Sequence, residues 1–190
     1  SGTALPGLHR GGVKPGDHVA VVGASGGGGP VAAQITKALG VEVTAISSTK
    51  KMERLRSLGA DHIVDYTRED FTQLGQRYDL ILAINGYRPL AEYRRALTPQ
   101  GTYVMVGGTG NQLTEAIVMG PLVSRRGGQR VTSFVASPNA NDLAFIAGLI
   151  EAGKITPVIE RTYMLEETAE AVRHVGAGHA AGKVVIKINP

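Results

Sequence analysis

The sequence predicts an α/β fold: a doubly wound parallel sheet (a Rossmann fold) with a C-terminal strand-helix-strand appendage. Short apolar runs alternate with helix-forming stretches along most of the 190 residues, which is typical of a parallel sheet covered on both faces. A glycine-rich turn at 23–29 joins the first apolar run to the first helical stretch, as in the βαβ units of such sheets.

The first part of the chain supplies three strands and two helices. The turn Lys14–Asp17 precedes an apolar run that begins at His18, and the run that ends at Ser47 is rich in β-branched residues. Gly40 and Gly59 stand where the helical stretches should end, because glycine commonly terminates a helix. The expected elements are a strand at 18–23, a helix at 30–39, a strand at 41–47, a helix at 50–58 and a strand at 62–65.

The middle of the chain continues the alternation. Asp79–Ile84 is an apolar run of strand length, and the turn Thr98–Gly101 separates the following helical stretch from the next run. A glycine-rich loop begins at Gly107. The expected elements are a strand at 79–84, a helix at 89–97, a strand at 102–106, a strand at 131–135 and an amphipathic helix at 141–152.

The last part of the chain has a different pattern. Two strands, at 158–164 and 183–188, flank one helix at 166–175. The second strand is apolar on both faces, so it needs a partner. We therefore divide the chain into a lead-in segment at 1–16, a Rossmann domain at 17–153 and a C-terminal segment at 154–190.

Composition limits the classes of function. The chain has no cysteine, which excludes disulfides and thiolate zinc sites within it and fits a cytoplasmic location. No apolar run reaches the roughly 20 residues of a membrane helix. The net charge is +4, but the lysines and arginines are scattered and tryptophan is absent. Nucleic acid is therefore not expected as the main partner.

The glycine turn predicts a dinucleotide site. Its frame is Gly23-x-x-Gly26-x-x-Gly29, placed after a strand and before a helix. Gly23 permits a sharp turn, Gly26 and its neighbour Gly27 permit close approach of a pyrophosphate, and Gly29 lets the helix pack on the strand. Pro30 fits the first turn of that helix, whose free amides would face the phosphates.

The residues after the second strand indicate which dinucleotide binds. A site for NAD usually has an acidic residue there to hold the ribose hydroxyls, but residues 45–51 contain no acid. Glu42 lies at the other end of the strand. Hydroxyls and the pair Lys50 and Lys51 suit the 2′-phosphate of NADPH instead, with a solvated helix face as the alternative interpretation of the two lysines.

The sequence resembles the medium-chain dehydrogenase/reductase superfamily, in particular its zinc-independent NADPH:quinone oxidoreductase branch. The resemblance runs from about Gly12 to Ile188. The motifs that carry it are Val13-Lys-Pro-Gly16, Gly23-Ala-Ser-Gly-Gly27, Leu58-Gly-Ala-Asp61, Val64-Asp-Tyr66, Pro157-Val-Ile159 and Gly182-Lys-Val-Val-Ile186.

The resemblance implies transfer of hydride from NADPH to a quinone or an α,β-unsaturated carbonyl. It places Lys51 and Tyr66 on the 2′-phosphate, with Ser47 nearby. It also places the loops after the fourth, fifth and sixth strands beside the nicotinamide; these loops are Asn85-Gly86, Gly107-Gly108-Thr109 and Phe134-Val135-Ala136. No metal site is expected in the chain, and no residue is assigned as catalytic.

The sequence departs from the family pattern at several places. Gly28 stands where an aliphatic residue is usual, which should loosen the contact between strand and helix. Ala83 and Asn85 replace the acidic and aliphatic residues often found at the end of the fourth strand. Relatives also carry an N-terminal domain ahead of residue 1, to which the segment matching 155–190 returns. We therefore expect the chain alone to bind NADPH but to be inactive.

Two classes of function stay open, and one mode of assembly is expected. The first class is the cofactor-binding domain of an NADPH-dependent oxidoreductase, and the alternative is a non-catalytic NADPH-binding or interaction module of the same fold. The strand at 131–135 should lie at a sheet edge, where an unpaired strand invites formation of a homodimer. The strand at 183–188 offers a competing contact and could pair with 158–164.

Overall fold

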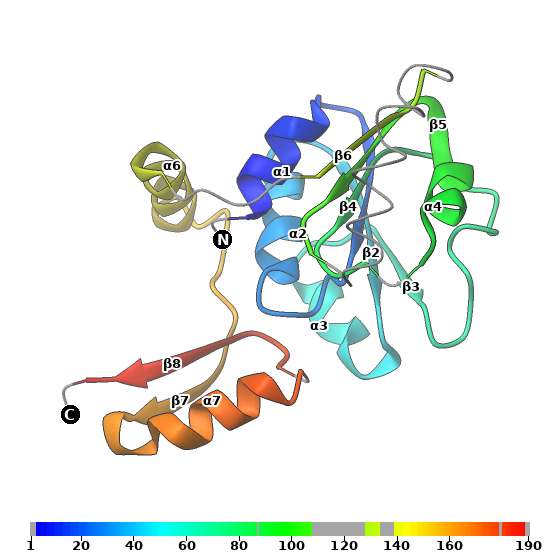
Figure 1. The fold of residues 1–190 in the computed structure, drawn as a ribbon. Coiled ribbons are helices and arrows are strands. Elements are labelled where there is room, and N and C mark those ends of the chain that lie inside the picture. Colours follow the sequence, from blue (N-terminus) through cyan, green and yellow to red (C-terminus); the bar gives the residue numbers. More distant parts are fainter. Residues whose placement is uncertain (1–2, 87, 108–127, 134–138, 179, 189–190) are drawn as a thin grey trace.

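A six-stranded parallel sheet forms the body of the molecule (Figure 1). The computed structural model describes residues 3–86, 88–107, 128–133, 139–178 and 180–188. The strand order is β3-β2-β1-β4-β5-β6, and every neighbouring pair is parallel. The strands are β1 (His18–Val22), β2 (Glu42–Ser47), β3 (His62–Asp65), β4 (Tyr78–Ala83), β5 (Leu97–Met105) and β6 (Arg130–Ser133).

Helices cover both faces of this sheet, which confirms the doubly wound fold. On one face α1, α2 and α3 pack against the strands, and α4 packs on the other (Figure 1). Each face has its own apolar core: Leu5, Ile35 and Leu82 belong to one, and Phe71 and Tyr93 to the other. The helices are α1 (Ala4–Gly11), α2 (Gly29–Ala38), η1 (Thr49–Lys51), α3 (Met52–Ser57), α4 (Leu90–Ala96) and α6 (Ala140–Glu151).

Helix α1 was not predicted; its residues fall in the segment interpreted as a lead-in. Pro6 and Gly7 lower its intrinsic helix propensity, which hid it in the sequence. Burial overrides that preference, because Leu5 and Leu8 are almost fully buried in the core. A Cβ on Gly11 would lie only 2.6 Å from a methyl carbon of Leu80, so the end of the helix lies directly against the sheet.

Most predicted boundaries lie within one or two residues of the observed ones, with two larger differences. The turn predicted at 98–101 is wrong, because β5 begins at Leu97 and pairs with Tyr78 before its register shifts. The helix predicted at 50–58 is a 3₁₀ turn followed by a six-residue helix. The strand predicted at 131–135 is observed as Arg130–Ser133, and residues 134–138 of the prediction and the loop after it lie outside the described residues.

The C-terminal segment forms a small second sheet. Strands β7 (Ile159–Met164) and β8 (Lys183–Lys187) pair in parallel, joined by η2 (Leu165–Glu167) and α7 (Thr168–Gly176). The buried side chain of Gln34 in α2 anchors the linker to this segment. Its Nε2 donates to the carbonyl of Thr156 at 3.0 Å, and its Oε1 accepts from the amide of Thr156 at 2.7 Å.

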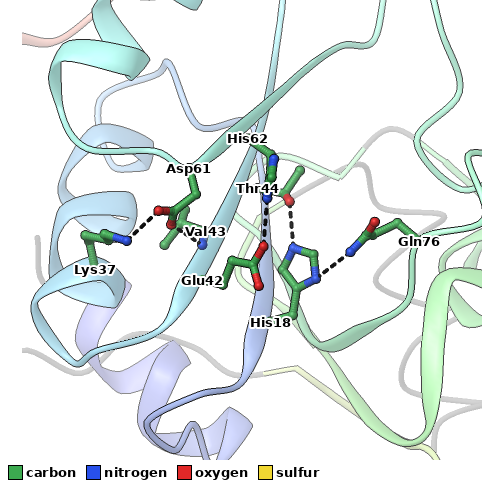
Figure 2. A network of polar contacts seen from close by, with 8 residues as sticks. All are labelled: His18, Lys37, Glu42, Val43, Thr44, Asp61, His62 and Gln76. Atoms are coloured by element: carbon green, nitrogen blue, oxygen red, sulfur yellow. Dashed lines mark hydrogen bonds and ion pairs between the residues drawn. The ribbon is translucent and has the colours of Figure 1, made fainter.

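A polar network lies at the amino-terminal end of the large sheet (Figure 2). The buried imidazole of His18 lies between Thr44 and Gln76, with both contacts at 2.9 Å. The amide nitrogen of Gln76 can only donate, so Nδ1 of His18 accepts and Nε2–H donates to Thr44. Outside this chain of hydrogen bonds, His62 pairs with Glu42, and Lys37 pairs with Asp61. The two hydrogen bonds of His18 to Thr44 and Gln76 require the neutral form of its imidazole.

We expect His18 to make the fold less stable in acid. Burial lowers the pKa of His18, and nearby Glu42 opposes this only in part. Because the folded pKa lies below the unfolded one, the stabilisation is complete above a pH of about 6.5 and decreases as the pH falls through the folded pKa. Urea unfolding between pH 7.5 and 5 should show the advantage of wild type over His18→Gln shrinking toward acid. A growing advantage would contradict this assignment.

Candidate functional site: a cleft at the carboxyl ends of the strands

Two hollows lie at opposite ends of the large sheet. One of about 550 Å³ is lined by residues near the amino-terminal ends of β2, β3 and β4, including Thr44, His62 and Tyr78. The other, of about 480 Å³, lies at the carboxyl ends, where ligands bind in open α/β sheets. Its lining residues are Gly23, Ser25, Gly26, Gly27, Ser47, Ser48, Lys51, Tyr66, Ile84, Asn85, Gly178 and Ala180. We take this second cavity, called the cleft below, as the candidate site.

The glycine turn lines the cleft. Gly23 has φ +76°, in the region that favours glycine, so the chain can leave β1 sharply. Gly29 begins α2, and a Cβ there would lie 2.3 Å from the carbonyl oxygen of Gly23. Only glycine therefore lets the start of α2 approach the end of β1 this closely. Gly29 is consequently a packing residue that does not line the cleft, whereas Gly26 and Gly27 do.

The start of α2 has the properties of an anion site. Gly28 is its N-cap residue and provides no side chain to bond the first amides, and Pro30 follows in the first turn. The first amides of a helix lack intrahelical partners, and the helix dipole adds positive charge there. This arrangement suits the pyrophosphate of a dinucleotide.

Ser47 ends β2 inside the cleft. Its side chain is 1% exposed, and its Oγ has no hydrogen-bond partner among the described residues. A buried polar atom without a partner costs roughly 1–3 kcal/mol, so such an atom is normally satisfied by a ligand or water. The Ser47 hydroxyl therefore fits a polar group of a bound cofactor.

The end of the cleft beside β2 and β3, formed by Ser47, Lys51 and Tyr66 and called the outer end below, is positively charged. Lys51 in η1 is half-buried and donates from Nζ to the carbonyl of Ala180 at 3.3 Å. Tyr66 lies just beyond β3 and is 43% exposed. No carboxylate of the described residues lines the cleft.

One buried acid lies next to this end but outside the cleft. Asp65 ends β3, and its carboxylate accepts hydrogen bonds from the hydroxyl groups of Thr49 and Thr67 and from the amide of Thr67. The bond from Thr49 is the main cause that holds the pKa of Asp65 below its usual value. Asp65 therefore stays charged at neutral pH and connects η1, the 3₁₀ turn that contains Lys51, to the end of β3.

The residues predicted beside the nicotinamide are only partly assembled here. Asn85 lines the cleft and lies against Gly23. Gly107 does not line it; a Cβ on Gly107 would lie 2.5 Å from the carbonyl oxygen of Ile84, so this glycine allows β4 and β5 to end side by side. Phe134 lies outside the described residues.

The C-terminal segment supplies a wall of the cleft that sequence reasoning missed. Gly178 and Ala180 line it, although more than a hundred residues separate them from the glycine turn. Lys183 lies close by, because its Nζ is 3.6 Å from the position of a Cβ on Gly27. The sequence shows the motif at 182–186, but nothing in its pattern predicts that it lies near the glycine turn.

The described residues show neither a metal cluster nor a membrane helix. No three His, Asp or Glu side chains of this part of the chain converge to hold a metal. His18 and His62 belong to the network of Figure 2, and His174 lies 3.5 Å from Glu160. None of the helices in the described ranges combines the length and the apolar character needed to cross a bilayer.

Comparison with known proteins gives consistent matches. The family described as zinc-binding dehydrogenase matches residues 58–186. The 2-methylene-furan-3-one reductase of Solanum lycopersicum is 32% identical over 97% of this chain and 44% of its own length. The mitochondrial NAD(P)H oxidoreductase RTN4IP1 of Mus musculus is 35% identical over 91% of this chain and 48% of its own length.

A solved structure shows the same architecture. The quinone oxidoreductase of Coxiella burnetii superimposes with a TM-score of 0.84 and 25% identity, over 100% of this chain and 58% of that one. The chain thus spans about half the length of the relatives it matches.

The close approach at Gly29 predicts a sharp contrast between two adjacent glycines. Gly29→Ala should lower the free energy of unfolding by about 1–3 kcal/mol, because backbone atoms must move to admit the Cβ. Gly28→Ala is the matched control, since its Cβ would meet nothing nearer than 3.5 Å and its φ is −109°. Urea unfolding of both variants tests this contrast, and equal stabilities would show that α2 does not depend on the approach.

Proposed function

Since the chain belongs to the zinc-binding dehydrogenase family, within the medium-chain dehydrogenase/reductase superfamily, we propose that it is the cofactor-binding part of an NADPH-dependent oxidoreductase. The proposed reaction transfers hydride to a quinone or an α,β-unsaturated carbonyl. We also propose that the protein belongs to the metal-free branch of the superfamily and that it is cytoplasmic.

The observation that carries the choice of NADPH is the chemistry of the outer end of the cleft. Ser47, Lys51 and Tyr66 line it together with Ser48, and no carboxylate of the described residues does. An ammonium and hydroxyl groups can satisfy a phosphate, whereas a free 2′-hydroxyl is usually held by an acid. The acid nearest in sequence to Tyr66, Asp65, already bonds to Thr49 and Thr67.

The remaining residues of the cleft would orient the cofactor. The amides at the start of α2 would hold the pyrophosphate, with Lys183 adding charge from the C-terminal segment. Asn85, at the end of β4, would flank the nicotinamide side. The bound cofactor supplies the hydride, and the protein's contribution is to bind and orient it.

The relatives support the class of substrate. One is named for reduction of a furanone that carries a methylene group, and another for reduction of quinones. Both are conjugated carbonyl compounds. We also propose a two-fold homodimer through β6, because this strand is an edge of the sheet that the described residues form.

The first test of the proposal is cofactor preference. NADPH should bind more tightly than NADH, and Lys51→Ala should weaken NADPH by about tenfold while leaving NADH nearly unchanged, because one charged hydrogen bond contributes about 1.5 kcal/mol. Lys50→Ala is the matched control: Lys50 is exposed and does not line the cleft. Calorimetric titration at moderate salt measures the affinities of wild type and both variants for NADPH and NADH. Equal binding of NADH and NADPH by wild type would favour the solvated-face interpretation of the lysines.

The second test concerns the reaction. We expect the 190-residue chain to bind NADPH without oxidising it in the presence of 1,4-benzoquinone, because its relatives are about twice as long. A full-length protein that contains this chain should oxidise NADPH with benzoquinone or an enone, followed at 340 nm. Rapid turnover by the chain alone would refute the first expectation. Retained NADPH binding with no turnover by the full-length protein would favour a non-catalytic module.

A further inference from the structure

The loop before β8 is held by three polar contacts. The carbonyl of Ala180 accepts from Nζ of Lys51 at 3.3 Å, and the carbonyl of Ala181 accepts from Nη1 of Arg54 at 2.8 Å. The amide of Ala181 donates to the carboxylate of Glu160 in β7 at 2.8 Å. The loop, Ala180–Gly182, is therefore fixed from both sides.

The loop also has little freedom to move sideways. Gly182 is buried, and a Cβ there would lie 2.7 Å from the carbonyl oxygen of Val158. Lys51 and Arg54 come from η1 and α3 of the Rossmann domain, whereas Glu160 comes from β7. The contacts thus connect the large sheet's helices to the C-terminal segment at the point where Ala180 enters the cleft.

The loop contacts the side chain of Lys51 through the carbonyl of Ala180. A lysine side chain has a flexible stem and three N–H donors, so a free ammonium group samples many positions. The bond to the Ala180 carbonyl holds the ammonium group at the wall of the cleft. A phosphate bound at this wall then meets an ammonium group that is already held in place, so less side-chain freedom is lost on binding.

We propose that Arg54 is a specificity-determining positioning residue for NADPH, which acts through the Ala180–Gly182 loop on Lys51. This inference rests on the proposed function and deepens it. Arg54 does not line the cleft, and its side chain is exposed, so solvent screens any direct effect of its charge on a phosphate. Its hydrogen bond to Ala181 holds the neighbouring carbonyl of Ala180 where Lys51 needs it. The C-terminal segment thereby takes part in discriminating NADPH from NADH.

A double-mutant cycle tests this proposal. Arg54→Gln should weaken NADPH by about threefold and leave NADH unchanged, whereas in the Lys51→Ala background it should have no further effect, because residues that act through one another are not additive. Arg56→Gln is the matched control: Arg56 is exposed on the same helix and does not line the cleft. Calorimetry on the 190-residue chain gives the affinities. The amide resonance of Ala181 should shift in Arg54→Gln and not in Arg56→Gln.

The possible outcomes distinguish failure of the positioning role of Arg54 from failure of the proposed NADPH site. An equal loss with Lys51 present or absent would mean that Arg54 acts by its own charge and would overturn the positioning role. No loss of NADPH affinity in Arg54→Gln, with a shifted Ala181 resonance, would overturn it as well. If Lys51→Ala alone leaves NADPH binding unchanged, the proposed cofactor site fails first and this inference fails with it.

Discussion

The close contact between the end of β1 and the start of α2 is the constraint on which the site depends. Gly29 allows the first turn of α2 to lie against the carbonyl of Gly23, and this places the free amides of the helix at the carboxyl edge of the sheet. A larger residue would push α2 outward and move these amides away from the neighbouring strand ends. The cleft exists because β1 is central in the sheet and the chain turns sharply as it leaves β1.

Around this contact the charges are distributed unequally between the two ends of the sheet. At the amino-terminal end, acids and bases are paired with each other, as Glu42 is with His62 and Asp61 with Lys37. At the carboxyl end, Asp65 is the acid nearest in sequence to the cleft, and hydroxyl groups enclose its carboxylate. Lys51 and the amides of α2 therefore face the cleft without a competing carboxylate among its described lining residues. Such an arrangement attracts a phosphorylated ligand.

The sequence predicted the sheet, its helices and most of the residues that line the cleft, because these features follow from local patterns. The glycine spacing, the apolar runs and the missing acid after β2 all lie within short stretches of chain. Helix α1 was missed because Pro6 and Gly7 conceal a helix that burial of Leu5 and Leu8 stabilises. The wall formed by Gly178 and Ala180 was missed because only tertiary packing brings it to the glycine turn. The cofactor contact of Gly107 stays a prediction, and in the fold its lack of a side chain also allows the approach of β5 to β4.

The choice of NADPH depends on whether the outer end of the cleft binds a 2′-phosphate. The most direct measurement compares two fragments of the cofactors, 2′,5′-ADP and 5′-AMP, by titration into the isotopically labelled chain. We expect 2′,5′-ADP to bind at least about tenfold more tightly, as one charged hydrogen bond implies, and to shift the resonances of Ser47, Lys51 and Tyr66. Equal affinities, with no shift at these three residues, would contradict it.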